Sequence, residues 1–159
     1  MTTKIVRLDS TDLQILALLQ QDARISNAEI GRRVGVVPSA VLQRLRKLRR
    51  QGVVQSLEAR IDPHAVGLAL TAFVFVQVDE RVGSLEAASR LAESSEVQEL
   101  HHLAGEDCYL LKVRVADTGA LGRFLRDEIG RLESVLSTRT TIVLETVKET
   151  GKLPLDAAV

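Results

Sequence analysis

The residues best suited to chemistry in this sequence lie in one basic segment, between Pro38 and Gly52. That segment holds five cations and no acid. Val41, Leu45 and Leu48 recur at helical spacing and predict one buried face. The remaining side chains point elsewhere, and the candidate nucleic-acid contacts among them are Ser39, Ala40, Gln43, Arg44, Arg46, Lys47 and Arg50. Such a helix suits a major groove, where early side chains read base edges and later Arg and Lys contact phosphates. An ordinary solvated helix is the alternative, although those usually mix both signs of charge.

A second group of polar residues suits a small zwitterion. Gly105 lets backbone approach a ligand, and Glu106 or Asp107 can accept hydrogen bonds from an ammonium group. Thr138 and Thr140 lie two apart in an extended segment and offer hydroxyls to a carboxylate. The alternative is a tight turn followed elsewhere by two ordinary strand threonines.

Other candidate chemistry is weaker. His101 and His102 are adjacent in a predicted strand, so they point to opposite faces and cannot chelate one ion together. Cys108 is the single cysteine, which rules out an internal disulfide. We find no nucleophilic triad, phosphate loop or paired carboxylates, and we therefore expect neither an enzyme, a metal site nor a cofactor.

Three helices must position the basic segment. Asp9 can cap the first, up to about Gln20, with Asp12 at its third position. Ser26 and Glu29 have capping-box spacing at the start of the second, which Val34 ends and Gly35 follows. Pro38 fits the first position of the third. A short helix, a glycine turn and a third helix predict a helix-turn-helix.

A strand over Val53–Ile61 is expected to leave these helices, followed by a turn at Asp62-Pro63-His64 that Gly67 closes. We place the domain boundary there, with a DNA-binding domain over 1–61 and an effector-binding and oligomerisation domain over 62–159. Beyond it the pattern predicts strand, helix, strand, strand, helix, strand over Leu68–Val78, Ser84–Ser94, Val97–Leu103, Cys108–Val115, a helix capped by Asp117, and Val135–Val147.

The expected fold class is α+β, with a winged helix-turn-helix of three helices followed by a ferredoxin-like βαββαβ domain. In that arrangement both helices cover one face of the sheet. Leu68–Val78 and Cys108–Val115 are apolar on both faces, so the uncovered face predicts homo-oligomerisation.

Charge divides the chain at the same place. Residues 1–60 carry 11 cations and 5 acids, a net +6, whereas residues 61–159 carry 10 cations and 16 acids, a net −6. Only the first half therefore suits a polyanion. No apolar run reaches membrane-spanning length and no secretory signal opens the chain, so we expect a cytoplasmic protein.

The whole chain resembles the leucine-responsive and asparagine regulators, the Lrp/AsnC or feast/famine family. The matching stretches are Leu8-Asp9-x-x-Asp12-x-x-Ile15-Leu16, Ala23-Arg24-Ile25-Ser26-Asn27-x-Glu29-Ile30, Arg44-Leu45-Arg46-Lys47-Leu48 with Gly52-Val53-Val54, Gly105-Glu106-Asp107-x-Tyr109-Leu110-Leu111-Lys112-Val113, and Thr138-Arg139-Thr140-x-Ile142-Val143-Leu144.

The resemblance implies a transcriptional regulator that binds double-stranded DNA as a dimer or a larger homo-oligomer. It also implies an amino-acid effector bound at a junction between dimers, and it adds Tyr109 to the candidate effector residues. Two positions depart from the family pattern: Val36-Val37-Pro38 replaces Leu-Ser-Pro, and Cys108 stands where the family has an aspartate.

Two other functions fit parts of the chain. Siroheme decarboxylases resemble this family in fold, but that activity gives the basic third helix no role. A stand-alone metabolite-sensing module explains residues 68–147 and again leaves the basic helix unused.

Overall fold

The computed structural model describes residues 6–81, 84–105 and 108–155. The chain forms two compact units: unit 1 holds residues up to 59 together with those from 149, and unit 2 holds residues 60–148. Within the described ranges, no helix is long and apolar enough to cross a membrane.

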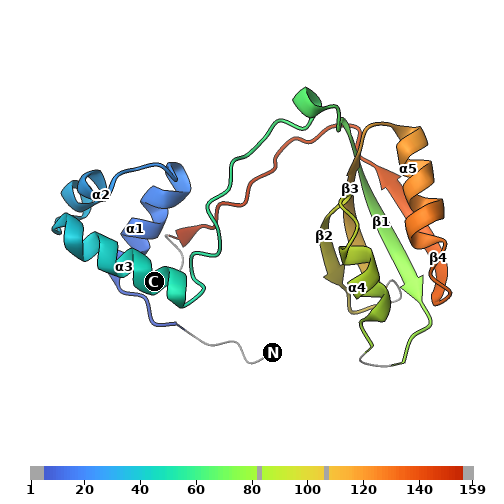
Figure 1. Cartoon of the computed structure of the whole chain (residues 1–159), viewed down its shortest axis with the longest axis horizontal. Helices are drawn as coiled ribbons and strands as arrows, with labels where there is room; N and C mark the ends of the chain where they lie inside the picture. Colours follow the sequence, from blue (N-terminus) through green and yellow to red (C-terminus); the bar gives the residue numbers. More distant parts are fainter. Residues whose placement is uncertain (1–5, 82–83, 106–107, 156–159) are drawn as a thin grey trace. The chain divides into compact units, whose positions relative to one another are not determined.

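Unit 1 is built from the three predicted helices: α1 (Ser10–Gln21), α2 (Asn27–Val34) and α3 (Pro38–Arg50) (Figure 1). They pack around a small apolar core of Ile15, Ile30, Val41 and Leu45, all buried. Asp9 and Asp12 form the capping box expected at the start of α1. At α2 only half of the predicted box forms: the Ser26 hydroxyl accepts the Glu29 N–H, and the Glu29 carboxylate turns elsewhere.

Two glycines make the turn between α2 and α3 possible. Gly35 ends α2 with a φ of 74°, in the left-handed region that favours glycine. Gly31 is buried, and a Cβ on it would overlap the carbonyl oxygen of Val36. The Val36 N–H also donates to the Gly31 carbonyl at 3.0 Å. The backbone after α2 therefore folds tightly back onto that helix before α3 begins.

A C-terminal segment returns to unit 1. The side-chain amide of Gln20 donates to the Leu153 carbonyl oxygen at 3.1 Å, and its carbonyl accepts the Leu153 N–H at 2.7 Å. These two bonds attach the returning segment to the last turn of α1, because the Gln20 amide satisfies both the N–H and the C=O of Leu153.

The prediction of an exit strand over Val53–Ile61 is wrong. Residues 53–61 are irregular, and no wing strand accompanies the helices in the described part of unit 1. The apolar alternation there is weak, and an extended segment needs a neighbouring backbone to satisfy its N–H and C=O groups. The turn after it does form, as a 3₁₀ turn over His64–Val66 ended by Gly67 at a φ of 77°.

Unit 2 has the predicted βαββαβ order. Its elements are β1 (Leu70–Val78), α4 (Glu86–Ala92), β2 (Val97–His102), β3 (Tyr109–Val115), α5 (Thr118–Phe124), a π-helical turn over Leu125–Ile129, and β4 (Val135–Ile142). The four strands form one antiparallel sheet in the order β2-β3-β1-β4, which confirms the ferredoxin-like topology.

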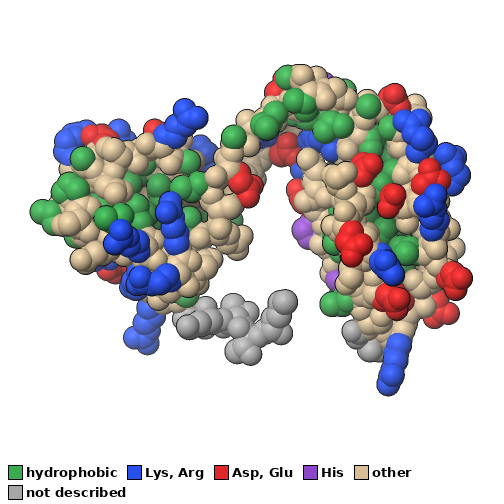
Figure 2. All heavy atoms as spheres, viewed as in Figure 1, with side chains coloured by type: hydrophobic (Ala, Val, Ile, Leu, Met, Phe, Trp, Pro, Cys, Tyr) green, Lys and Arg blue, Asp and Glu red, His purple; other side chains and the backbone are tan. Residues whose placement is uncertain are grey.

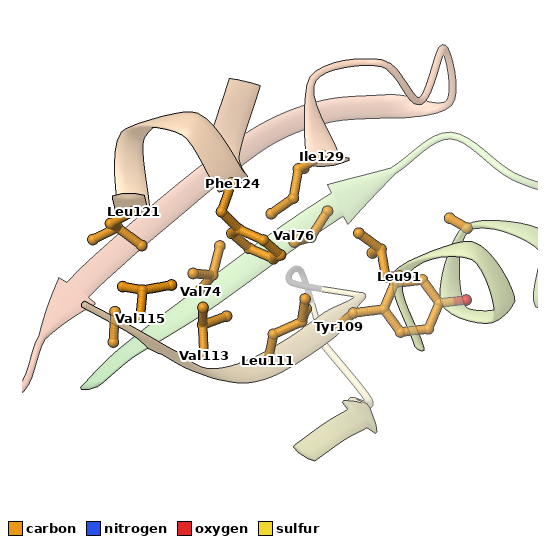
Figure 3. Close-up of a cluster of buried hydrophobic side chains, with 12 residues drawn as sticks. Val74, Val76, Leu91, Tyr109, Leu111, Val113, Val115, Leu121, Phe124 and Ile129 are labelled. Carbon is orange, nitrogen blue, oxygen red and sulfur yellow. The ribbon is translucent and has the colours of Figure 1, made fainter. Parts of the chain in front are cut away.

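The core of unit 2 lies between one sheet face and the two helices (Figure 3). Val74 and Val76 from β1 and Leu111 and Val113 from β3 are fully buried there. Alternate residues point to the other face, where Phe73, Phe75 and Leu110 remain partly exposed. The sheet is thus covered on one side only, as predicted.

The last strand is shorter than expected. β4 ends at Ile142, opposite Ala72, and a final backbone bond joins the Val143 N–H to the Thr71 carbonyl at 2.9 Å. Beyond that point β1 has almost no residues left to pair with, so residues 143–147 leave the sheet.

Candidate nucleic-acid interface

The outward face of α3 carries most of the predicted nucleic-acid contacts. Val41, Leu45 and Leu48 are buried against α1 and α2. Because successive helical residues differ by about 100° in direction, the opposite face is a single stripe formed by Ser39, Gln43, Arg46 and Arg50. All four are exposed, and exposed Lys47 borders the stripe, whereas Ala40 is half-buried. Figure 2 shows Lys and Arg side chains gathered on unit 1.

The exposed cations of this face form no ion pair within the part of the chain that the structure describes. Among the described residues, no hydrogen bond or salt bridge holds the side chains of Arg46, Arg49 or Arg50, and Lys47 acts on Asp9 only as a nearby charge. Unpaired cations on one exposed face produce a strong local positive potential. The arrangement is therefore suited to an extended polyanion.

Arg44 is placed differently from its neighbours. Its Nη1 donates to Asp9 Oδ2 at 2.6 Å and to Asp12 Oδ1 at 2.7 Å, across the gap between α3 and α1. Asp12 is only 1% exposed, so Arg44 neutralises a carboxylate that water barely reaches. Nothing in the local sequence pattern indicates this partnership, because the residues are more than 30 positions apart.

The same network changes the acidity of Asp9. The hydrogen bond from Arg44, and then the bond from the Asp12 N–H, hold the pKa of Asp9 below its usual value. The stabilising effect of a carboxyl with a lowered pKa is present above its ordinary pKa and is lost as the pH falls through the lowered one. The contribution of Asp9 to the α1–α3 contact is therefore expected to decrease as the pH falls below the ordinary pKa of the carboxyl.

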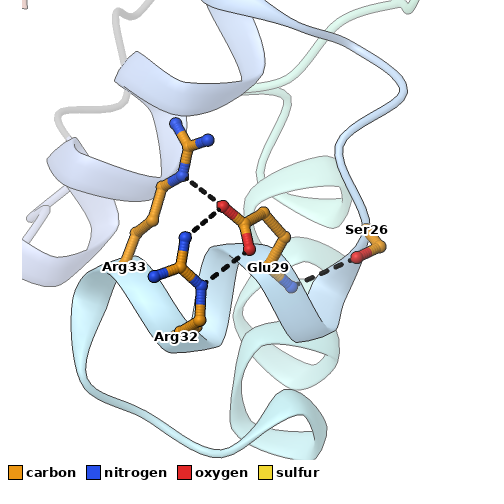
Figure 4. Close-up of polar contacts among 4 residues, drawn as sticks. All are labelled: Ser26, Glu29, Arg32 and Arg33. Atoms are coloured by element: carbon orange, nitrogen blue, oxygen red, sulfur yellow. Dashed lines mark hydrogen bonds and ion pairs between the residues drawn. The ribbon is translucent and has the colours of Figure 1, made fainter.

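On α2, Glu29 holds two arginines (Figure 4). Its carboxylate accepts from Arg32 Nε and Nη2 at 2.9 and 2.7 Å and from Arg33 Nε at 2.6 Å. These bonds lower the pKa of Glu29 to about 2. Two of the cations of unit 1 are thus partly neutralised on α2, and the positive charge without partners is concentrated on α3.

The start of α3 lacks a side-chain cap. Val37 occupies the N-cap position, makes no capping hydrogen bond, and is 64% exposed. Pro38 follows at the first helical position, where its missing N–H costs nothing. The departure from the family pattern at Val37 therefore leaves the helix intact, with Pro38 setting its first turn.

The predicted effector residues come from separate parts of unit 2. Gly105 has a φ of 148°, which favours glycine, and an added Cβ would have open space around it. Glu106 and Asp107 lie outside the described residues. Tyr109 is 2% exposed and packs in the core, with its ring 5.1 Å from that of His102. Burial, and then the charge of Glu80, raise the pKa of Tyr109.

Thr138 and Thr140 do share one strand face, as predicted. They pair with Val76 and Val74 of β1, so they lie on the helix-covered side of β4. β4 is one edge of the sheet, and β2, which leads into the Gly105 turn, is the other. Within one chain, β1 therefore separates β3, which follows the turn, from β4, which carries the two threonines.

The two histidines lie as expected. His101 pairs with Leu110 on the open face and contacts Glu99 at 3.3 Å, whereas His102 pairs with Tyr109 on the core face. In the described ranges, no group of three or more His, Cys, Asp or Glu residues is placed to hold a metal ion.

A cleft of about 980 Å³ lies beside α4, between the end of β1 and the start of β4. Acidic side chains dominate its walls, among them Glu80, Glu93, Glu96, Asp127 and Glu128. None of the described predicted effector residues lines it. One buried oxygen there, Glu80 Oε2, accepts no hydrogen bond, whereas Oε1 accepts the Ala87 N–H at 2.7 Å.

Both units match known sequence families. The AsnC-type helix-turn-helix domain matches residues 8–49, and the Lrp/AsnC ligand binding domain matches residues 71–153. The leucine-responsive regulatory proteins of Klebsiella pneumoniae and Escherichia coli K12 are each 38% identical over 148 residues, which covers 92% of this chain and 90% of theirs.

Solved structures agree. A transcriptional regulator from Neisseria meningitidis, in complex with L-Met, superposes with a TM-score of 0.87 at 32% identity and covers 96% of this chain and all of its own. A feast or famine regulatory protein from M. tuberculosis, complexed with L-methionine, has a TM-score of 0.85 at 37% identity over 92% of this chain and 99% of its own.

The Arg44 network gives a stability prediction. We expect Arg44→Met to lower the free energy of unfolding of unit 1 by about 1–3 kcal/mol, because buried Asp12 loses the donor that balances its charge. Arg49→Met, at an exposed position of the same helix, is the matched control and should change stability little. Denaturant titration followed by circular dichroism measures both. Equal stabilities of the two variants would contradict a structural role for Arg44.

Proposed function

The chain belongs to the Lrp/AsnC family of transcriptional regulators, and we propose that it binds double-stranded DNA sequence-specifically through α3 and responds to an amino-acid effector. The observation that carries the proposal is the exposed basic stripe of α3, which has no acidic partner among the described residues. Lys and Arg on such a face release counterions from DNA when they neutralise phosphates, and this favours binding.

Within this proposal the residues of α3 divide by position. Ser39, Ala40 and Gln43 lie in the first half of the helix, which contacts base edges in helix-turn-helix proteins. The later cations Arg46, Lys47 and Arg50 contact phosphates. Arg44 contributes mainly by holding α3 against α1, so its effect on DNA binding is through the position of its neighbours.

The proposed effector site needs a second copy of the chain. The relatives solved with L-methionine make an amino acid the expected ligand class. In this proposal Glu106 and Asp107, which follow Gly105 in the sequence, supply acceptors for an ammonium group, and Thr138 and Thr140 supply hydroxyls from β4. Tyr109 follows them in the sequence, and its side chain is buried beside the ring of His102. A junction between copies can join one chain's turn to another chain's β4.

The open sheet face supports a homo-oligomer. Phe73, Phe75 and Leu110 present apolar surface there, and the Arg139 guanidinium lies 3.9 Å above the Phe75 ring. Lys112 and Arg114 of β3 share this face, opposite Phe73 and Thr71. Apolar side chains on a sheet face are stabilised when a partner removes them from water. We propose that two copies pack these faces together, and that effector binding favours the assembly that completes its site.

The proposed role is regulatory and not enzymatic. The relatives are transcriptional regulators. The basic stripe has a direct role in DNA binding, whereas a siroheme decarboxylase activity would give it none. A regulator that binds genomic DNA acts where the chromosome lies, and the relatives are bacterial regulators, so we propose a cytoplasmic location.

For DNA binding, we expect Arg46→Ala and Lys47→Ala each to weaken affinity for every duplex. Each should also flatten the dependence of log K on log salt by about one, because one phosphate contact is lost. Arg126→Ala, an exposed arginine of unit 2, is the control. Fluorescence anisotropy at several salt concentrations gives the slopes. If both variants match wild type, α3 is not the DNA-binding helix.

For assembly, we expect Phe73→Glu to reduce the mass of the full-length protein in solution, because it replaces an apolar ring of the open face with a charge that packing of two copies would have to desolvate. Leu85→Glu places the same charge at a 54% exposed leucine on the helix side and should leave the mass unchanged. Multi-angle light scattering measures both. An unchanged oligomer in the Phe73 variant would show that copies meet elsewhere.

For sensing, we expect at least one of the twenty amino acids, L-methionine first among them, to raise the melting temperature of the wild-type protein. Gly105→Val should abolish that shift while DNA binding without ligand persists, because a side chain at this φ strains the turn. Gly151→Val, where φ is ordinary and the space is open, is the control. No shift with any amino acid would refute the sensing proposal and leave DNA binding standing.

A further inference from the structure

Gln43 differs chemically from the rest of the α3 stripe. It is exposed at the centre of the helix, the sixth of 13 residues, and no hydrogen bond involving its side chain is found in the described part of the chain. Its amide has a carbonyl acceptor and an NH₂ donor side by side at the end of a flexible stem. The long side chains next to it on the stripe, Arg46 and Arg50, have donors only.

This pairing of donor and acceptor matches one base. In the major groove adenine presents an N7 acceptor and an N6 donor, which a glutamine amide can bind with two hydrogen bonds. Guanine presents two acceptors, N7 and O6, and suits an arginine instead. Ser39 also carries a donor and an acceptor, but its hydroxyl is a single atom and cannot make the two-bond contact that distinguishes adenine.

The packing of unit 1 fixes the direction of Gln43. Val41 and Leu45, two positions before and two positions after Gln43, are buried in the core, and Arg44 is bound to α1. These three contacts leave α3 little freedom to rotate about its axis. The backbone of Gln43 is therefore held in place with its side chain on the exposed face of α3. Such a fixed position favours discrimination between bases over non-specific DNA binding.

We propose that Gln43 reads an adenine, so that the DNA site of this protein contains an A·T pair at the position that Gln43 faces. The inference rests on the proposed function and goes beyond it, because it names the base and the residue that selects it. The neighbouring cations supply affinity that does not depend on sequence, and Gln43 supplies the discrimination at this pair.

The test is selection from a randomised pool of duplex DNA with the full-length protein. Wild type should enrich sites with a fixed A·T pair at one position. Gln43→Arg should enrich sites with a G·C pair at that position, and Gln43→Ala should show no base preference there. The control is Gln14→Ala, which removes an exposed glutamine from α1 and should enrich the wild-type site. In direct titrations, changing that A·T pair to G·C should weaken wild-type binding roughly 5- to 150-fold and Gln43→Ala binding less than about twofold.

The outcomes separate this inference from the proposed function. If Gln43→Ala and Gln43→Arg enrich the same site as wild type, Gln43 does not read a base, although the protein still binds DNA. The inference is also overturned if the site enriched by wild type contains no fixed A·T pair whose selection depends on Gln43. If wild type enriches no site and binds no duplex, the proposed function fails and the inference fails with it.

Discussion

The presentation of α3 depends on the contact between Arg44 and the paired carboxylates of Asp9 and Asp12. One guanidinium satisfies the nearly buried Asp12, and the same two acids form the capping box that begins α1. The start of one helix and the orientation of another are therefore set by a single charged cluster. With Arg44 held on one side and the apolar residues beneath, only one stripe of α3 remains free to meet a partner.

Charge in unit 1 is consequently divided between structure and binding. Arg44, Arg32 and Arg33 are engaged with acids of their own unit, whereas Arg46, Arg49 and Arg50 form no ion pair among the described residues. Arginines already paired with acids contribute less net positive charge toward phosphates. The count of cations in a basic helix therefore overstates the number available to DNA, and position on the helix decides which ones are available.

Local patterns in the sequence were enough to predict most of the fold. The spacing of Val41, Leu45 and Leu48 predicts α3, and the strand and helix order of the second half predicts the ferredoxin-like sheet. Arg44 escaped prediction because its partners are set by how two helices cross, which no short-range pattern encodes. The exit strand failed because a strand requires a neighbour as well as alternation. The effector site stays a prediction: Thr138 and Thr140 lie on β4, which β1 separates from β3, and the pattern within one chain does not indicate what a second chain would add.

The hydrogen bonds between Gln20 and Leu153 bear on how such a regulator can be dissected. The DNA-binding unit is discontinuous in the sequence, since residues from 149 onward fold with the first 59. A chimaera that takes only the N-terminal helices from one regulator would leave behind the segment that binds the end of α1. An exchange of DNA-binding units between relatives therefore requires two junctions, one after α3 and one after β4. Each DNA-binding unit then keeps its own C-terminal segment.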